Sequence, residues 1–363
     1  MKHGVSIPLL HGLRGGGLGN EVIPWAKAFI ASRELDLNVL HPSWGLSARE
    51  YRHDFATSRL DWLGERALRV SLPTKRITEL MVRETGESDY ALALRALSSE
   101  LNLGRGRPVA VLNEGMSGGY YGIQRARDFL HQQLLRPRHI AGDLYRMSEA
   151  LDPERLTVAV HVRTGDFGSE IHGPTPGQFN TSLPAGWYEA VIASIDHHFR
   201  EAVQYVIFSD AYDSELLKRL VLSERVIVPP LRRRPLLSDL FSMVNADLLV
   251  CSVSSFSMLA AFLSDKPYVW FEPHLNVHGG WRSLWGHEEA QRAPRGLTAQ
   301  NILSAEVEAD SIFGRGVAVG MNGELPDELV ELLDRRSFLK RRRHDLLYYG
   351  VIPASGTVSE LNR

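Results

Sequence analysis

The chain has 363 residues, of which 44% are hydrophobic and 23% charged, the balance of an ordinary globular protein. Its formal net charge of −2 excludes the strong positive field of a sequence-independent nucleic-acid binder, so no nucleic acid is expected as a partner. The single cysteine, Cys251, excludes an intrachain disulfide. Apolar stretches are short or interrupted by serine and proline, which predicts no integral membrane segment, no secretory leader and a cytoplasmic location.

The first half of the chain shows a few separate helix and strand patterns rather than a regular alternation. In chain order these are a short apolar piece at 5–10, a helix at 20–33, an apolar run at 37–40, a strand at 108–112 and a helix at 123–135. Residues 45–107 are too charged to be assigned to helices or strands. The polar stretch 136–155 is interpreted as the connection between two domains.

The second half alternates between strand and helix patterns. The segments are 157–162, 203–208, 225–228, 247–251 and 267–271 for strands, and 187–199, 214–222, 236–245 and 257–263 for helices. Such alternation predicts parallel βαβ units with right-handed crossovers, that is, an α/β fold. Ligands of such sheets bind beyond the carboxyl ends of the strands, so the residues that follow each strand are the candidates for a site.

Three segments carry groups suited to an anion. Glycines at 15–17 and 19, before a helix, let the backbone approach a phosphate, although they fit neither the dinucleotide nor the P-loop pattern. Arg163 ends one predicted strand and offers a planar donor fork. Serines at 252–257 separate another strand from its helix. The alternatives are a tight turn, a surface ion pair of Arg163 with Asp166, and a capped helix without a ligand.

Together and in order, these segments resemble the fucosyltransferase superfamily, especially the bacterial alpha-1,2-fucosyltransferases of glycosyltransferase family 11. Residues 16–20 are similar to the family's GGLGNQ segment, 161–167 to HxRRGDY, 208–210 to FSDD, and 254–257 to the SSFS of NSSFSWW. The resemblance implies a GT-B fold of two Rossmann-like domains facing across a cleft. It also implies inverting transfer of fucose from GDP-fucose to a hydroxyl of a glycan or small glycoside, with no metal and no other cofactor.

The resemblance further implies a domain division and roles for individual residues. It places an acceptor-side domain at 1–150, a nucleotide-sugar-binding domain at 151–300 and a helical extension at 301–363. Arg163 would bind the pyrophosphate, and His161 and Asp239 would help to hold guanine. The remaining expected donor-binding residues are Gly17, Gly19, Asn20, Ser255, Phe256 and Ser257. Asp210, at a strand end, is expected to touch ribose or acceptor.

The chemistry of sugar transfer restricts the catalytic groups. No Asp-x-Asp pair occurs in the chain, so the charge of the leaving diphosphate must be stabilised by Arg163, the serine-capped helix and the glycine amides. A base for the acceptor hydroxyl is sought among Glu21, Asp166 and Asp210. Glu21 can equally be a favourable residue in the first turn of a helix, and Asp166 a structural turn residue that binds backbone amides.

Two further functions stay open at this point. Thr164 stands where the family has a second arginine, so the donor could be another nucleotide sugar. A noncatalytic nucleotide-sugar or glycan-binding protein would carry the same motifs.

Four aromatic residues could stack on an acceptor sugar, with core packing as the alternative; they are Trp25, Trp44, Tyr120 and Tyr121.

Overall fold

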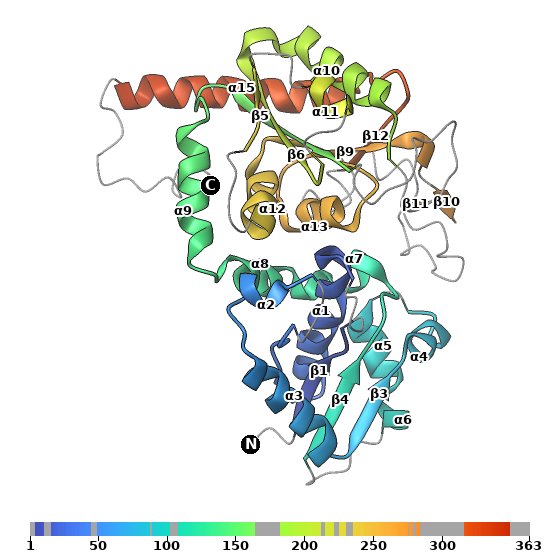
Figure 1. The fold of residues 1–363 in the computed structure, drawn as a ribbon. Helices are drawn as coiled ribbons and strands as arrows, with labels where there is room; N and C mark the ends of the chain where they lie inside the picture. Colours follow the sequence, from blue (N-terminus) through green and yellow to red (C-terminus); the bar gives the residue numbers. More distant parts are fainter. Residues whose placement is uncertain are drawn as a thin grey trace.

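The protein is built from two α/β lobes, and helix α9 (His139–Glu149) runs between them (Figure 1). The computed structural model describes residues 4–10, 16–44, 49–87, 89–101, 108–163, 182–211, 215–220, 225–229, 235–274, 276–278, 281–283 and 316–348. Each lobe contains a parallel sheet. The predicted α/β fold with two Rossmann-like halves is therefore confirmed.

The N-terminal lobe contains a four-stranded parallel sheet in the order β2-β1-β4-β3. Its strands are β1 (Gly4–Pro8), β2 (Asn38–Val39), β3 (Thr74–Ile77) and β4 (Val109–Asn113). Its helices are α1 (Leu18–Glu34), α2 (Tyr51–Asp54), α3 (Arg59–Ser71), α4 (Glu79–Glu84), α5 (Tyr90–Ala96), α6 (Ser98–Leu101), α7 (Gly119–Gly122), η1 (Gln124–Ala126) and α8 (Arg127–Leu135). Helix α1 follows β1 and contacts β1, β2 and β4, so the lobe is organised around this largely buried helix.

The C-terminal lobe contains a six-stranded parallel sheet in the order β12-β9-β8-β5-β6-β7. Its strands are β5 (Leu156–Val162), β6 (Val203–Ser209), β7 (Val226–Ile227), β8 (Leu248–Val250), β9 (Tyr268–Phe271) and β12 (Gly316–Val319). Its helices are α10 (Ala185–Phe199), η2 (Arg200–Ala202), α11 (Glu215–Leu220), α12 (Pro235–Asn245), α13 (Ser255–Leu263), η3 (Glu272–His274) and α15 (Asp327–Tyr348). A separate antiparallel pair is formed by β10 (Asn276–His278) and β11 (Trp281–Ser283).

Alternate side chains of the C-terminal sheet enter two different cores. On β5, Val158 and Val160 pack in one core with residues of α10, α11 and α15, whereas Ala159 packs in the other with α12 and α13. This separation follows from the two-residue period of a strand. The second core continues across the lobe boundary into α1, α5 and α8, so the two lobes share apolar packing.

Polar contacts reinforce the seam between the lobes. Arg127 of α8 donates to the carbonyl oxygens of Phe262 and Leu263 at 2.7 and 2.9 Å, which satisfies free carbonyls at the end of α13. Its guanidinium also lies 2.5 Å from Asp265. Next to this contact, the rings of Tyr120 and Phe262 lie 5.1 Å apart.

Three stretches contain elements that the sequence patterns did not indicate. The stretch 136–155, expected as the connection between two domains, runs between the lobes and contains helix α9 (His139–Glu149), which packs on α12 because Ile140 and Met147 form one apolar face. The unassigned stretch 45–107 supplies β3 and the helices α2 to α6. Beyond residue 300, where only a helical extension was expected, the short β12 joins the C-terminal sheet beside β9.

In the part of the chain that the structure describes, no helix has both the length and the apolarity needed to cross a membrane.

A single glycine controls how closely the lobes approach. A Cβ on Gly19 would lie 2.1 Å from the carbonyl oxygen of Ser255 in the other lobe, whereas a Cβ on Gly17 would meet Ser255 Oγ at 3.8 Å. We expect Gly19→Ala to lower the free energy of unfolding by about 1–3 kcal/mol, the usual cost of overpacking. Urea unfolding of both variants tests this, with Gly17→Ala as the matched control. Equal stabilities of Gly19→Ala and Gly17→Ala would contradict the tight contact.

Candidate functional site

The candidate site lies where the order of the C-terminal sheet reverses. In this sheet β5 is the first strand along the chain; β6 and β7 follow on one side, and β8, β9 and β12 on the other. In such doubly wound sheets the crossovers leave a crevice at the carboxyl ends of the two central strands. Here these are β5, which ends at Val162, and β8, which ends at Val250. The predicted arginine and the predicted serine turn follow these two strands.

Arg163 is oriented by an acidic neighbour on the next strand. Because Val162 pairs with Ser209 in the parallel register, Arg163 and Asp210 leave the sheet side by side. The guanidinium Nε lies 3.3 Å from Asp210 Oδ2, and the two side chains are 21% and 23% exposed. The arginine therefore lies at the sheet edge, accessible to solvent, with its orientation restrained by an ion pair.

His161 ties the end of β5 to the start of α13. Its Nδ1 lies 2.6 Å from Ser257 Oγ and 2.9 Å from Ser252 Oγ, and its carbonyl oxygen accepts a hydrogen bond from the Tyr188 hydroxyl at 3.1 Å. Burial, aided by the nearby Arg163 charge, lowers the pKa of His161 to about 3. The imidazole is therefore neutral at neutral pH, and it positions the serine turn rather than supplying positive charge.

The serines of the turn divide into structural and accessible ones. Ser254 caps α13 by accepting the Phe256 backbone N–H at 3.2 Å. Ser257 is fully buried, and besides contacting His161 it accepts the Ser252 backbone N–H at 3.2 Å. Ser255 and Phe256 are half-buried at the first turn. Of the expected phosphate-binding residues on α13, Ser257 thus serves the internal network, and the helix start at Ser255 and Phe256 faces the other lobe.

The glycine segment of the N-terminal lobe meets this helix start directly. Gly17 precedes the first turn of α1, and Gly19 packs on the Ser255 backbone. The Tyr120 hydroxyl lies 2.6 Å from the Gly19 carbonyl oxygen and 3.1 Å from that of Ser255. Asn20 Oδ1 is buried and has no hydrogen-bond partner among the described residues. The two predicted anion-binding segments therefore come together, one from each lobe.

Glu21 holds the glycine segment from within. Its side chain is 2% exposed, and Oε1 accepts the Gly16 backbone N–H at 2.6 Å. In this position the carboxylate holds the backbone of the loop. Glu21 also lies in the first turn of α1, as the alternative to a catalytic base supposed. The structure thus places Glu21 behind the glycine segment, with its carboxylate engaged by the backbone.

Asp239 and Asp166 are the two remaining predicted site residues. Asp239 lies one turn into α12, half-buried, and its neighbour Ser238 donates to Asp143 Oδ2 of α9 at 2.5 Å. Because α12 runs from β7 to β8, its first turn lies at the carboxyl edge of the sheet. Asp166 and Thr164 lie outside the described residues.

Sequence reasoning missed the structural roles of Tyr120 and Lys27. Lys27 is fully buried in α1, and its Nζ donates to the carbonyl oxygens of Gly115 and Glu114 at 3.0 and 3.3 Å, just beyond β4. Burial lowers its pKa to about 7. Because Lys27 is the one charged residue in the otherwise apolar sequence 25–30, the sequence could have indicated a buried lysine here. Nothing local distinguishes Tyr120, whose two partners are 101 and 135 residues away.

Among the residues that the structure describes, no group of three or more His, Cys, Asp or Glu side chains is arranged to hold a metal ion.

The neutral state of His161 predicts a pH dependence of stability. The unfolded chain takes up this proton near the ordinary pKa of 6.5 and the folded protein only near 3, so the stability from this site is present above pH 6.5 and lost as pH falls toward 3. Its slope approaches about 1.4 kcal/mol per pH unit. We expect His161→Asn to be less stable than wild type at pH 7, with a difference that shrinks by pH 5 in urea unfolding.

The exposed His198 on α10 provides the control for this measurement. His198→Asn should follow the wild-type profile at every pH, because its ring lies in solvent. A stability difference between wild type and His161→Asn that is the same at pH 7 and pH 5 would show that the imidazole is not held neutral.

Comparisons with known proteins were made by sequence and by structure. No family model matches the chain, and no curated protein matches it. Among solved structures, the NodZ alpha-1,6-fucosyltransferase soaked with GDP-fucose matches at 12% identity and a TM-score of 0.42, over 74% of this chain and 94% of that one. The heptosyltransferase WaaC of E. coli with ADP matches at 12% identity and a TM-score of 0.37, over 93% of this chain and 99% of that one. The same enzyme with ADP-2-deoxy-2-fluoro heptose matches at 12% identity and a TM-score of 0.35, over the same shares.

Proposed function

We propose that this protein is an inverting glycosyltransferase of the GT-B type that transfers fucose, or a related sugar, from a GDP donor to a hydroxyl of a glycan or small glycoside. Three elements suited to an anion support the proposal: two follow neighbouring strands at the switch point of the C-terminal sheet, and the third packs on one of these two. These are Arg163 after β5, the start of α13 after β8, and the glycine segment at the start of α1. Their sequences are the ones that resemble the fucosyltransferases.

The site is suited to a diphosphate leaving group. When the bond between the anomeric carbon and the diphosphate breaks, positive charge develops on the sugar and negative charge on the leaving phosphate. Arg163, held by Asp210, offers a guanidinium, and the first turn of α13 adds the N–H groups and positive end of a helix. Each such donor contributes about 2–4 kcal/mol to the stabilisation of developing charge. This charge balance needs no divalent cation, and we propose that the reaction proceeds without one.

The base for the acceptor hydroxyl is assigned from the three carboxylates named by the sequence. Glu21 is buried and bound to the Gly16 amide, and Asp210 is paired with Arg163. Both already serve positioning roles. We therefore propose Asp166, three residues after Arg163 in the sequence, as the base, with a structural turn residue as the alternative role.

Donor binding provides the test of the proposal. GDP without magnesium should raise the melting temperature of the wild type more than UDP or ADP does, because a ligand bound by the folded state alone stabilises it by mass action. Arg163→Ala should lose this shift, and its turnover with GDP-fucose should fall by about 100- to 1000-fold, the usual cost of losing one oxyanion donor.

Arg219→Ala is the matched control, because it also breaks an arginine-carboxylate pair of the C-terminal lobe, 2.7 Å long, to Glu189 on α10. This variant should keep both the GDP shift and the turnover. Stronger stabilisation by UDP than by GDP would assign a different donor. GDP binding without hydrolysis or transfer across a panel of acceptors would favour the noncatalytic alternative.

A further inference from the structure

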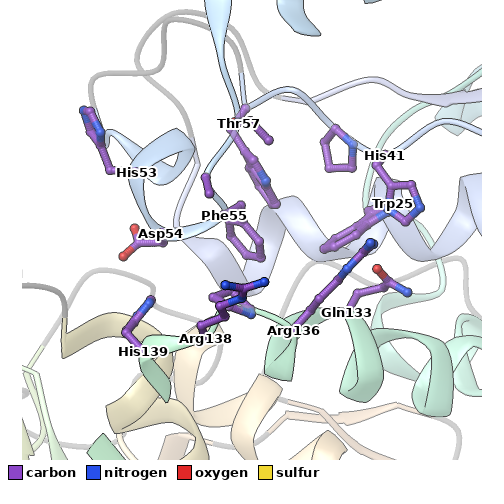
Figure 2. Close-up of a pocket in the computed structure, with 14 residues that line it drawn as sticks. Trp25, His41, His53, Asp54, Phe55, Thr57, Gln133, Arg136, Arg138 and His139 are labelled. Atoms are coloured by element: carbon purple, nitrogen blue, oxygen red, sulfur yellow. The ribbon is translucent and has the colours of Figure 1, made fainter. Parts of the chain in front are cut away.

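A cavity outside the proposed donor site is lined mainly by residues of the N-terminal lobe (Figure 2). It has a volume of about 560 Å³, within the range of small-ligand pockets. Its walls come from the segment after β2, from α2 and the turn after it, from α1, and from the junction of α8 and α9. The segment after β2 and the glycine segment after β1 leave neighbouring parallel strands, so both lie at the same edge of the N-terminal sheet.

Aromatic rings form one wall of this cavity. Trp25 of α1 makes edge contacts with Trp44 and Phe55 at centroid distances of 5.7 and 6.0 Å, and Trp44 stacks on Phe55 at 4.5 Å. Trp25 is 2% exposed, and its Nε1 has no hydrogen-bond partner among the described residues. A buried indole N–H without an acceptor is costly. Trp44 is also buried, at 3% exposure, so the half-buried Phe55 ring supplies the flat apolar surface of this wall.

Positive charge comes from the opposite side of the cavity. Figure 2 shows the side chains of Arg136 and Arg138 extending from the α8–α9 junction toward Trp25 and Phe55. Three histidines also line the cavity, whereas Asp54 is the one carboxylate among its described lining residues. Arginine forks bind carboxylate and phosphate groups with two parallel hydrogen bonds. The cavity therefore combines a stacking surface with recognition of an anion.

The backbone of this region is strained at two lining residues. Trp44 and Ala56 have φ angles of 57° and 52°, which non-glycine residues rarely adopt. The hydrogen bond from Thr57 Oγ1 to the Ser43 carbonyl oxygen, 2.8 Å long, connects the two lining segments. Strain of this kind is retained where the surrounding structure holds it and often coincides with ligand sites.

The aromatic wall is joined to the proposed donor site by direct contacts. Tyr51 donates from its hydroxyl to the Gly16 carbonyl oxygen at 3.2 Å, and its ring contacts Trp44 at 5.5 Å. Along α1, Trp25 is six residues from Gly19, a rise of about 9 Å. A ligand in the cavity therefore lies near the glycine segment that closes on the other lobe.

We propose that this cavity is the acceptor subsite and that it binds a sugar ring carrying a carboxylate or phosphate group. The apolar C–H face of the ring packs on the half-buried Phe55, which is backed by the buried Trp44, and the anionic group lies against Arg136 and Arg138. The designation as acceptor site rests on the proposed glycosyltransferase function. The binding of an anionic sugar rests on the cavity alone, so the two are tested by separate signals.

The experiment is ¹⁹F NMR of the full chain labelled with 5-fluorotryptophan, in which Trp25→Phe and Trp44→Phe assign two of the seven tryptophan signals. Methyl glucuronide and glucose 6-phosphate are titrated separately to distinguish the carboxylate from the phosphate. At least one of them should shift the signals of Trp25 and Trp44, and neutral methyl glucoside should bind more weakly. Arg136→Gln should raise the Kd by about tenfold or more, the loss expected for one charged hydrogen bond.

Arg335→Gln is the control, because Arg335 is 74% exposed on α15 in the other lobe; it should leave the Kd unchanged. The proposal is overturned if neither anionic sugar shifts these two signals, if methyl glucoside binds as well, or if Arg136→Gln has no effect. Equal binding of inorganic phosphate would overturn recognition of the sugar ring. GDP shifting the signals of Trp25 and Trp44 would reassign the cavity to the donor. If GDP does not raise the melting temperature of the wild type but the anionic sugar still shifts the signals of Trp25 and Trp44, the result would count against the proposed function and not against this cavity.

Discussion

The close approach of two backbones, at Gly19 and Ser255, is the contact on which the proposed site depends. At this point the first turn of α1 in one lobe meets the first turn of α13 in the other. A helix N-terminus presents free N–H groups and a positive dipole end, and two of them converge here. The Tyr120 hydroxyl lies between the two carbonyl oxygens, so the contact is held by polar as well as apolar packing.

Near this contact, His161 and Arg163 lie at the end of the same strand but differ in charge. His161 is neutral because it is buried, and it is used to hold Ser252 and Ser257. The charge at the sheet edge then comes from Arg163, whose direction is set by Asp210. A partly buried cation whose orientation is restrained in this way interacts more strongly with a diphosphate than a flexible surface charge does.

The N-terminal lobe contributes two sets of groups from one sheet edge. The glycine segment follows β1, and the strained, aromatic segment that contains Trp44 follows β2. Neighbouring parallel strands bring these segments together, and Tyr51 connects them. An acceptor bound in the aromatic cavity and a donor bound at the switch point would thus be positioned by one continuous framework, with α1 as its shared element.

The sequence by itself determined the element order of the second half and the residues that follow its strands, because helix and strand periods are local properties of the chain. It identified Arg163, the serine turn and the glycine segment as one set. Only the tertiary structure decided that β5 and β8 are neighbours, that Glu21 supports a loop, and that Tyr120 joins the lobes. Strand order and these contacts depend on residues far apart in the chain, and no local sequence pattern indicates which of them meet. The cavity could not be predicted for the same reason, because its walls come from α1, α2 and α8.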